Sequence, residues 1–180
     1  MNGPIVTVTR LRRHLPVHVL LLDGLFANAG YWLPYLQQLQ SFRVSLLGID
    51  YERVLDRGMP LSTLAQEAEL LLGDGSAHLA CHSFGCIVAP YFSRSWLSRT
   101  FLCPTFAALS IDRDAFCAAI SERLDTAPGA VRPLLEQALE RKGQCLPEIS
   151  WAASDTIWLP ADDPYFSYAE PAANTDCLRY

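Results

Sequence analysis

The sequence predicts an α/β fold, in which a mainly parallel sheet is flanked by helices, from the order of its apolar segments. Short apolar runs typical of buried strands occupy residues 17–22, 42–49, 77–81 and 100–103. Patterns with helical spacing of apolar residues lie between them, at residues 31–39, 61–72 and 85–97. Strands that alternate with helices form parallel sheets with right-handed crossovers, so we expect one such layer across residues 17–103.

Local signals mark where these elements end. The first strand is closed by Asp23 and Gly24 and the second by Asp50, which we expect to cap the following turn. The helix predicted over 61–72 ends at Gly73. Its apolar face consists of Leu61, Leu64, Ala65, Ala68 and Leu72. Pro90 lies inside the pattern at 85–97, where it weakens or kinks a helix.

The alternation stops after Pro104. Residues 112–124 and 130–142 both show amphipathic helical patterns with no strand between them, and a short strand returns at 156–159. We interpret residues 105–150 as a small helical lid inserted into a single domain that spans residues 1–180 and is shortened at its C-terminus.

Composition limits the classes of function. With 51% hydrophobic residues and 18% charged ones, the chain is not disordered, and with 14 Lys and Arg against 19 Asp and Glu it has no basic stripe for nucleic acid. No segment approaches the roughly 20 apolar residues of a membrane span. We interpret the six cysteines as reduced thiols and expect a soluble, cytoplasmic protein without a cofactor or metal.

The segment Cys81-His82-Ser83-Phe84-Gly85 carries the clearest chemical signal. An apolar strand that turns sharply at a serine exposes the hydroxyl at the end of the sheet, beside a helix N-terminus that stabilises a developing oxyanion. The pattern is G-x-S-x-G, with Cys81 in place of the first glycine. Ser83 is therefore the candidate nucleophile, and a plain strand-to-helix turn is the alternative.

With these residues the chain resembles the α/β-hydrolase superfamily. Residues 21–25 look like the family's oxyanion loop, with Asp23 where histidine is usual and Trp32 where an aromatic residue commonly follows. Residues 161–167 are similar to the acidic turn of small serine hydrolases of the retinoblastoma-binding-protein type. The resemblance implies Ser83 as nucleophile, Asp163 as the acid, and the backbone N–H groups of Leu25 and Phe84 as the oxyanion hole.

The histidine that the resemblance places after the acid is missing, because residues 164–180 contain none. A serine hydroxyl is a weak nucleophile without a base. We interpret the four histidines present as structural: His14, His18 and His78 lie far from the turn, and His82, next to Ser83, points away from it.

Asp23 has two interpretations. A carboxylate beside an oxyanion hole opposes the charge that develops there, unless its pKa is raised or the side chain turns outward. Asp23 either caps a turn through nearby N–H groups, or it replaces the missing base or serves a non-hydrolytic reaction. Asp112 is a helix cap and a reserve candidate for the acid, and Tyr165, Phe166 and Tyr168 either line an acyl pocket or pack in the core.

The first functional hypothesis is a serine esterase or thioesterase that acts on an apolar acyl group, with a small-molecule acyl substrate or an acyl carrier as partner and a homo-oligomer left open. The second is a catalytically silent module that binds a ligand or a protein. The third is a gene product that lost its last segment and histidine, or receives the histidine from another subunit.

Overall fold

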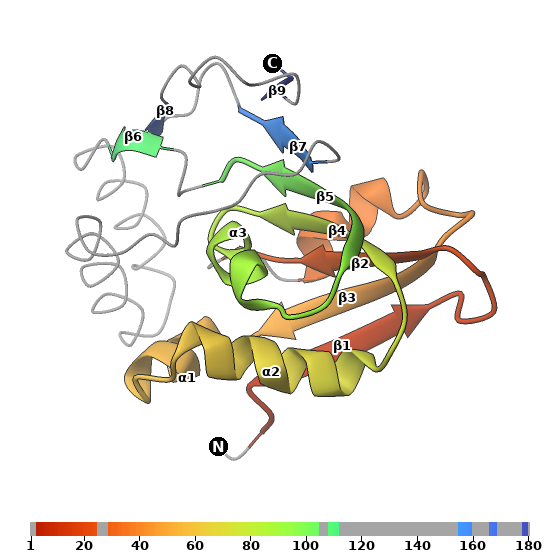
Figure 1. Cartoon of the computed structure of the whole chain (residues 1–180), viewed down its shortest axis with the longest axis horizontal. Coiled ribbons are helices and arrows are strands. Elements are labelled where there is room, and N and C mark those ends of the chain that lie inside the picture. The colour runs from red at the N-terminus through yellow and green to blue at the C-terminus, as the bar shows by residue number, and fades with distance from the viewer. Residues whose placement is uncertain are drawn as a thin grey trace.

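The computed structural model describes residues 3–24, 29–104, 108–111, 155–159, 166–168 and 178–179. Its main sheet has seven strands in the order β1-β3-β2-β4-β5-β7-β9 (Figure 1). These strands are β1 (Val6–Leu11), β2 (His18–Leu22), β3 (Arg43–Ile49), β4 (Ala77–His82), β5 (Trp96–Leu102), β7 (Asp155–Trp158) and β9 (Leu178–Arg179). All neighbours from β3 to β9 pair in parallel, and β1 pairs antiparallel with β3. The mainly parallel sheet confirms the predicted fold class.

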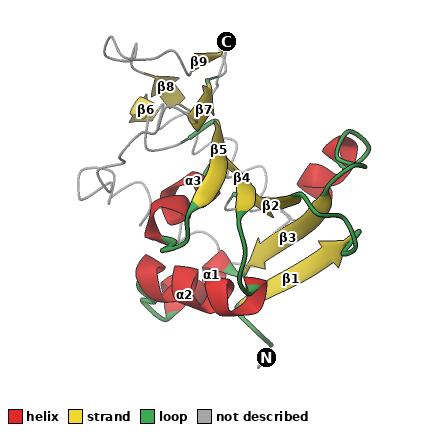
Figure 2. Ribbon diagram, turned by 45° about the vertical axis from the view of Figure 1, so that its right-hand side comes forward, coloured by secondary structure: helices red, strands yellow, loops and turns green. Residues whose placement is uncertain are grey.

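Helices cover both faces of this sheet. Figure 2 shows α1 (Tyr51–Asp56), α2 (Leu61–Leu72) and α3 (Gly85–Val88) on one side of the strands, and the 3-10 helix η1 (Ala29–Tyr35), orange in Figure 1, lies on the other. The apolar core is divided accordingly. One cluster joins Leu20, Leu22 and Leu79 to the first set of helices, and a second joins Val19 and Leu21 to Trp32 of η1.

The helix α2 has the predicted bounds because its apolar stripe and its stop signal agree. Leu64, Ala65, Ala68 and Leu72 are buried, and the backbone N–H of Gly73 bonds to the carbonyl of Glu69. Gly73 has a φ of 72°, a left-handed conformation that glycine adopts without steric cost. Asp50 also acts as predicted, because its carboxylate accepts a hydrogen bond of 3.1 Å from the N–H of Arg53 in α1.

The helix predicted over 85–97 is wrong in length. The α-helix α3 ends at Val88, the 3-10 helix η2 (Ala89–Tyr91) follows, and β5 begins at Trp96, earlier than predicted. Pro90 explains this, since proline lacks an N–H and its ring clashes with the carbonyl four residues earlier. Within the pattern at 31–39, only the part up to Tyr35 is helical, as the end of the 3-10 helix η1 that contains Pro34, and turns follow it.

The structure adds elements that the apolar pattern did not reveal, namely β1, α1 and a small antiparallel sheet of β6 (Ala108–Ile111) and β8 (Phe166–Tyr168). The strand β6 precedes the first predicted lid helix, and both lid helices, at 112–124 and 130–142, lie outside the described residues. The returning strand predicted at 156–159 is confirmed as β7.

An ion pair joins the first residue of β7 to the middle of β5. Nε of Arg99 donates to Oδ1 of Asp155 over 2.9 Å, and Nη2 donates to Oδ2. The Asp155 side chain is fully buried and the Arg99 guanidinium lies over the ring of Phe101. Within the described part of the chain, no helix is long and apolar enough to cross a membrane.

Candidate active site

The backbone at Ser83 makes the sharp turn that the sequence predicts between β4 and α3. Ser83 has a φ of 50°, a left-handed conformation that non-glycine residues adopt at a cost of about 1–3 kcal/mol. Its N–H donates to the carbonyl of Leu102 over 2.9 Å, and its carbonyl accepts from the N–H of Cys86 over 3.0 Å. Ser83 thus still bonds to the neighbouring strand β5 while its carbonyl already starts the helix.

Glycines lie where the two chain segments around this turn approach closely. A Cβ atom on Gly24 would lie 2.8 Å from Cβ of Ser83, and one on Gly85 would lie 2.5 Å from the carbonyl oxygen of Asp23. Real Cβ atoms essentially never come this close to other atoms, so both positions require glycine unless the backbone moves. The end of β2 and the start of α3 therefore pack backbone against backbone around Ser83.

Cys81 occupies the position of the first glycine in the pattern without disturbing the turn. Its side chain is buried in the core, donates to the carbonyl of Thr100 over 3.5 Å and interacts with the thiol of Cys86. Burial raises the pKa of the Cys86 thiol well above its usual range, and the neighbouring Cys81 adds to this rise. Both cysteines have free thiols and belong to the buried core.

The site lies where the strand order reverses. The chain places β3 on one side of β2 and then returns to place β4 on the other side. The register pairs Leu22 with Cys81, so Gly24 and Ser83 lie side by side just past the carboxyl ends of these strands. In open parallel sheets, ligands bind in the crevice at this reversal because the two connections leave in opposite directions.

Asp23 is buried next to this reversal of the strand order, with 4% of its surface exposed. Burial raises the pKa of its carboxyl to about 6, and a hydrogen bond from Trp32 opposes part of that rise. Its Oδ1 has no hydrogen-bond partner among the described residues, and the N–H groups of the turn that follows it lie outside them, so the turn-cap interpretation stays a prediction. The Asp23 side chain is thus buried rather than turned outward, and this burial raises its pKa.

Tyr51 is the residue that the sequence analysis missed. It is the first residue of α1, shortly after β3 ends, and 3% of its surface is exposed. Its hydroxyl donates to the main-chain carbonyl of Asp23 over 3.0 Å, and its ring meets that of Phe84 edge to face. The position of Tyr51 in the sequence could have revealed it, because Tyr51 follows the carboxyl end of β3. The carboxyl ends of parallel strands lie together, so residues that follow them are candidates for the site.

His18 and His78 lie as the structural interpretation expects, whereas His82 does not. His18 and Ser45 share a buried hydrogen bond of 2.8 Å, and His78 and Ser98 share one of 2.7 Å. Burial, helped by the positive charge of Arg43, lowers the pKa of His18 to about 4. His82 lies at the site itself, since a Cβ on Gly24 would be 3.3 Å from its Nδ1.

The remaining candidates lie outside the described residues. These are Leu25 of the oxyanion loop, the acid Asp163, the reserve acid Asp112 and the aromatic Tyr165. Phe166 and Tyr168 belong to β8, where they pair with β6. Their roles stay predictions from the sequence.

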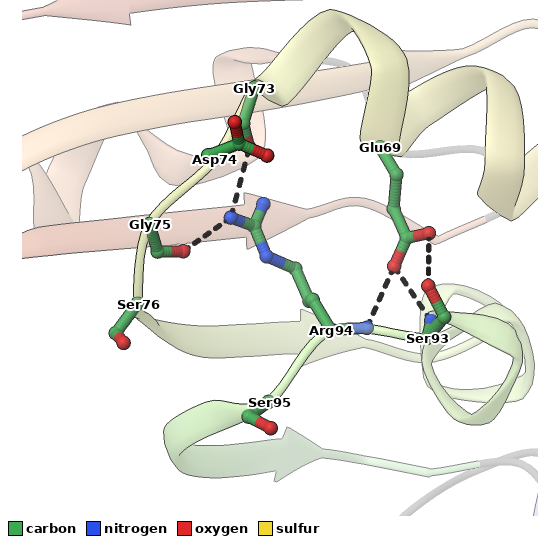
Figure 3. A pocket seen from close by; sticks show the side chains of 8 residues that line it. All are labelled: Glu69, Gly73, Asp74, Gly75, Ser76, Ser93, Arg94 and Ser95. Carbon is green, nitrogen blue, oxygen red and sulfur yellow. Dashed lines mark hydrogen bonds between the residues drawn. The ribbon is translucent and has the colours of Figure 1, made fainter.

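A polar pocket of about 400 Å³ lies at the amino ends of β4 and β5, away from the turn at Ser83 (Figure 3). The carboxylate of Glu69 accepts hydrogen bonds from the N–H and hydroxyl of Ser93 and from the N–H of Arg94, and Nη2 of Arg94 donates to the carbonyls of Gly73 and Gly75. Nε and Nη1 of Arg94 are buried away from solvent. These bonds tie the end of α2 to the loop before β5, so we assign them to structure.

No protein-family model and no curated protein matches the sequence. The structure is similar to solved ones, among them the NocB thioesterase domain in covalent complex with a fluorophosphonate nocardicin G analog. That likeness has a TM-score of 0.63 at 16% identity and covers 87% of this chain and 78% of that one.

Two esterase-type structures are also similar. A carboxylesterase structure from Nitrososphaera gargenis has a TM-score of 0.51 at 13% identity, covering 69% of this chain and 50% of that one. A lipase-esterase related protein from Clostridium acetobutylicum has a TM-score of 0.50 at 15% identity, covering 76% and 65%. The chain thus spans half to two thirds of the length of these two proteins. Together with the sheet order, these likenesses show that the chain has an α/β-hydrolase fold.

Proposed function

We propose that the protein is a serine hydrolase that cleaves an ester or thioester of an apolar acyl group, with Ser83 as its nucleophile. The observation that carries this proposal is the left-handed backbone of Ser83. This residue lies where Gly24 and Gly85 allow two chain segments to approach closely, and where the strand order of the sheet reverses. A serine held in a costly conformation at the carboxyl ends of the central strands, beside a helix start, is the arrangement that acyl transfer uses.

In the proposed reaction, the Ser83 hydroxyl attacks the acyl carbonyl and loses its proton to a base. The alcohol or thiol then leaves with a proton, and water releases the acyl group from the serine. The N–H groups of Phe84 and Leu25 would hold the oxyanion. The acid would be Asp163. The protein would be similar to the small serine hydrolases of the retinoblastoma-binding-protein type, with a lid over residues 105–150. These parts of the proposal rest on the sequence alone.

The base is the open element of this proposal. No histidine follows Asp163 in the sequence. Asp23 is buried next to the turn and its pKa of about 6 suits proton transfer near neutral pH, which supports it as a stand-in. The same buried carboxyl, when ionised, would oppose an oxyanion, and this favours the second candidate, a catalytically silent module that binds its ligand in the same crevice.

A fluorophosphonate probe separates the two candidates. A probe of this class forms the covalent complex of the similar NocB thioesterase domain, so it suits the fold. We expect an intact-mass increase of one phosphonyl group in the wild type and none in Ser83→Ala, while the matched control Ser93→Ala still reacts. A folded wild type without an adduct would contradict the hydrolase and favour the silent module.

Two further variants test the base. If Asp23 takes the proton, Asp23→Ala lowers the labelling rate, and added imidazole restores part of it by acting as an external base. An unchanged rate in Asp23→Ala would remove Asp23 from the mechanism and leave Ser83 as the nucleophile.

A further inference from the structure

Tyr51 connects the two main-chain segments that border Ser83. Its hydroxyl donates a hydrogen bond of 3.0 Å to the carbonyl oxygen of Asp23, and both partners are buried. Burial, together with the nearby Asp23 carboxyl, raises the pKa of Tyr51 well above its usual range. The phenol therefore keeps its proton and remains a donor throughout the working pH range.

The carbonyl that Tyr51 binds is held from a second side. Gly85 approaches it so closely that a Cβ there would lie 2.5 Å from the oxygen. Because the peptide unit is planar and trans, the carbonyl of Asp23 and the N–H of Gly24 point in opposite directions. Fixing this oxygen therefore fixes the orientation of the whole Asp23–Gly24 peptide, including the N–H of Gly24.

The ring of Tyr51 contacts the other segment. It meets the Phe84 ring with centroids 5.2 Å apart and planes at 81°, the edge-to-face geometry that aromatic pairs prefer. Phe84 directly follows Ser83, and its side chain packs against the core on the same side as Tyr51. One side chain from α1 thus touches both segments, from two directions.

We propose that Tyr51 is a positioning residue for the oxyanion hole, holding the Asp23–Gly24 peptide through the carbonyl of Asp23 and the Phe84 segment through its ring. This inference rests on the proposed function, which gives the donor roles to Leu25 and Phe84. Donors act only when they lie about 2.7–3.1 Å from the developing charge, so a small shift of one segment lowers the rate. Tyr51 itself touches no reacting atom.

The test replaces Tyr51 by phenylalanine, which keeps the ring contact and removes the hydroxyl. The matched control is Ser45→Ala, which also removes a buried hydrogen bond but at the opposite end of β3 from Tyr51. Fluorophosphonate labelling is resolved into the maximal rate and the probe concentration for half that rate. We expect Tyr51→Phe to lower the maximal rate about tenfold with an unchanged half-saturation.

Comparison with the control decides the outcome. If Ser45→Ala loses stability and keeps its labelling rate, while Tyr51→Phe loses rate, the positioning role is supported. Equal labelling rates in Tyr51→Phe and Ser45→Ala would overturn it.

If the wild type is not labelled, the proposed hydrolase fails, and amide spectroscopy then decides the inference. The nitrogen and proton shifts and the hydrogen exchange of the Gly24 and Phe84 N–H groups are compared in the same variants. We expect the Gly24 group to change in Tyr51→Phe, the Phe84 group to change less because its ring contact is kept, and both to stay constant in Ser45→Ala. Unchanged signals in Tyr51→Phe would overturn the inference.

Discussion

The carbonyl oxygen of Asp23 lies so close to Gly85 that a Cβ on this glycine would be 2.5 Å from it. Residues that are far apart in the sequence therefore meet backbone to backbone, with Ser83 beside them. This contact explains why the second position of the G-x-S-x-G pattern is a glycine, because α3 begins directly against the end of β2. This contact, rather than the flexibility of glycine, determines which residues the position accepts.

Gly85→Ala should destabilise the fold by about 2–3 kcal/mol, because the backbone oxygen in its way belongs to a buried strand end and cannot move freely. Denaturant unfolding measures the change. Gly3→Ala is the control, since the nearest atom to a Cβ there is the flexible end of Arg53 at 3.9 Å, and we expect a change within about 0.5 kcal/mol. Equal stability of the two variants would contradict the close approach.

Ser83→Gly should be more stable than Ser83→Ala by about 1 kcal/mol, although both lose the hydroxyl. Glycine relieves the left-handed strain at a φ of 50° and alanine keeps it. At the exposed Ser76, whose φ is not positive, Ser76→Gly should be less stable than Ser76→Ala. Glycine there relieves no strain and only raises the conformational entropy of the unfolded chain. The same order at both positions in thermal unfolding would argue against strain at Ser83.

Asp23→Asn should change the pH dependence of stability. The folded state raises the pKa of Asp23 from 3.8 to about 6, so the stability linked to its protonation is complete below pH 3.8 and is lost as the pH rises through 6. Relative to the wild type, Asp23→Asn should therefore gain on the order of 1–3 kcal/mol between pH 4 and pH 8. Denaturant midpoints across this range measure the difference, and a pH-independent difference would refute the buried carboxyl.

Asp155→Ala should destabilise the fold by about 3–5 kcal/mol, because it leaves Arg99 without its buried partner. The double variant with Arg99→Met should lose less than the sum of the single changes, since neither charge then remains. The surface pair of Arg53 and Asp50, 3.8 Å apart, is the comparison, and Arg53→Met should cost about 1 kcal/mol or less. Additive losses at Arg99 and Asp155 would show that the pair does not act as a unit.

The sequence predicts most of the central sheet and the helix α2 correctly because their signals are local. Each buried strand of the parallel layer is an apolar run, and α2 has both a stripe and a glycine stop. β1 and α1 escaped prediction for the opposite reason. β1 is a mostly exposed edge strand and α1 has only six residues, so neither carries a long apolar pattern.

For the candidate site, the sequence by itself determined the turn at Ser83, because an apolar strand, a serine and a glycine follow one another over a few residues. Only the tertiary structure decided that Asp23 is buried with a raised pKa, that Gly85 meets the carbonyl of Asp23, and that Tyr51 joins this carbonyl to Phe84. The physical reason is distance along the chain. Local patterns encode which segments turn or pair, whereas burial, charge and close approach depend on segments that meet only after β2, β3 and β4 have assembled.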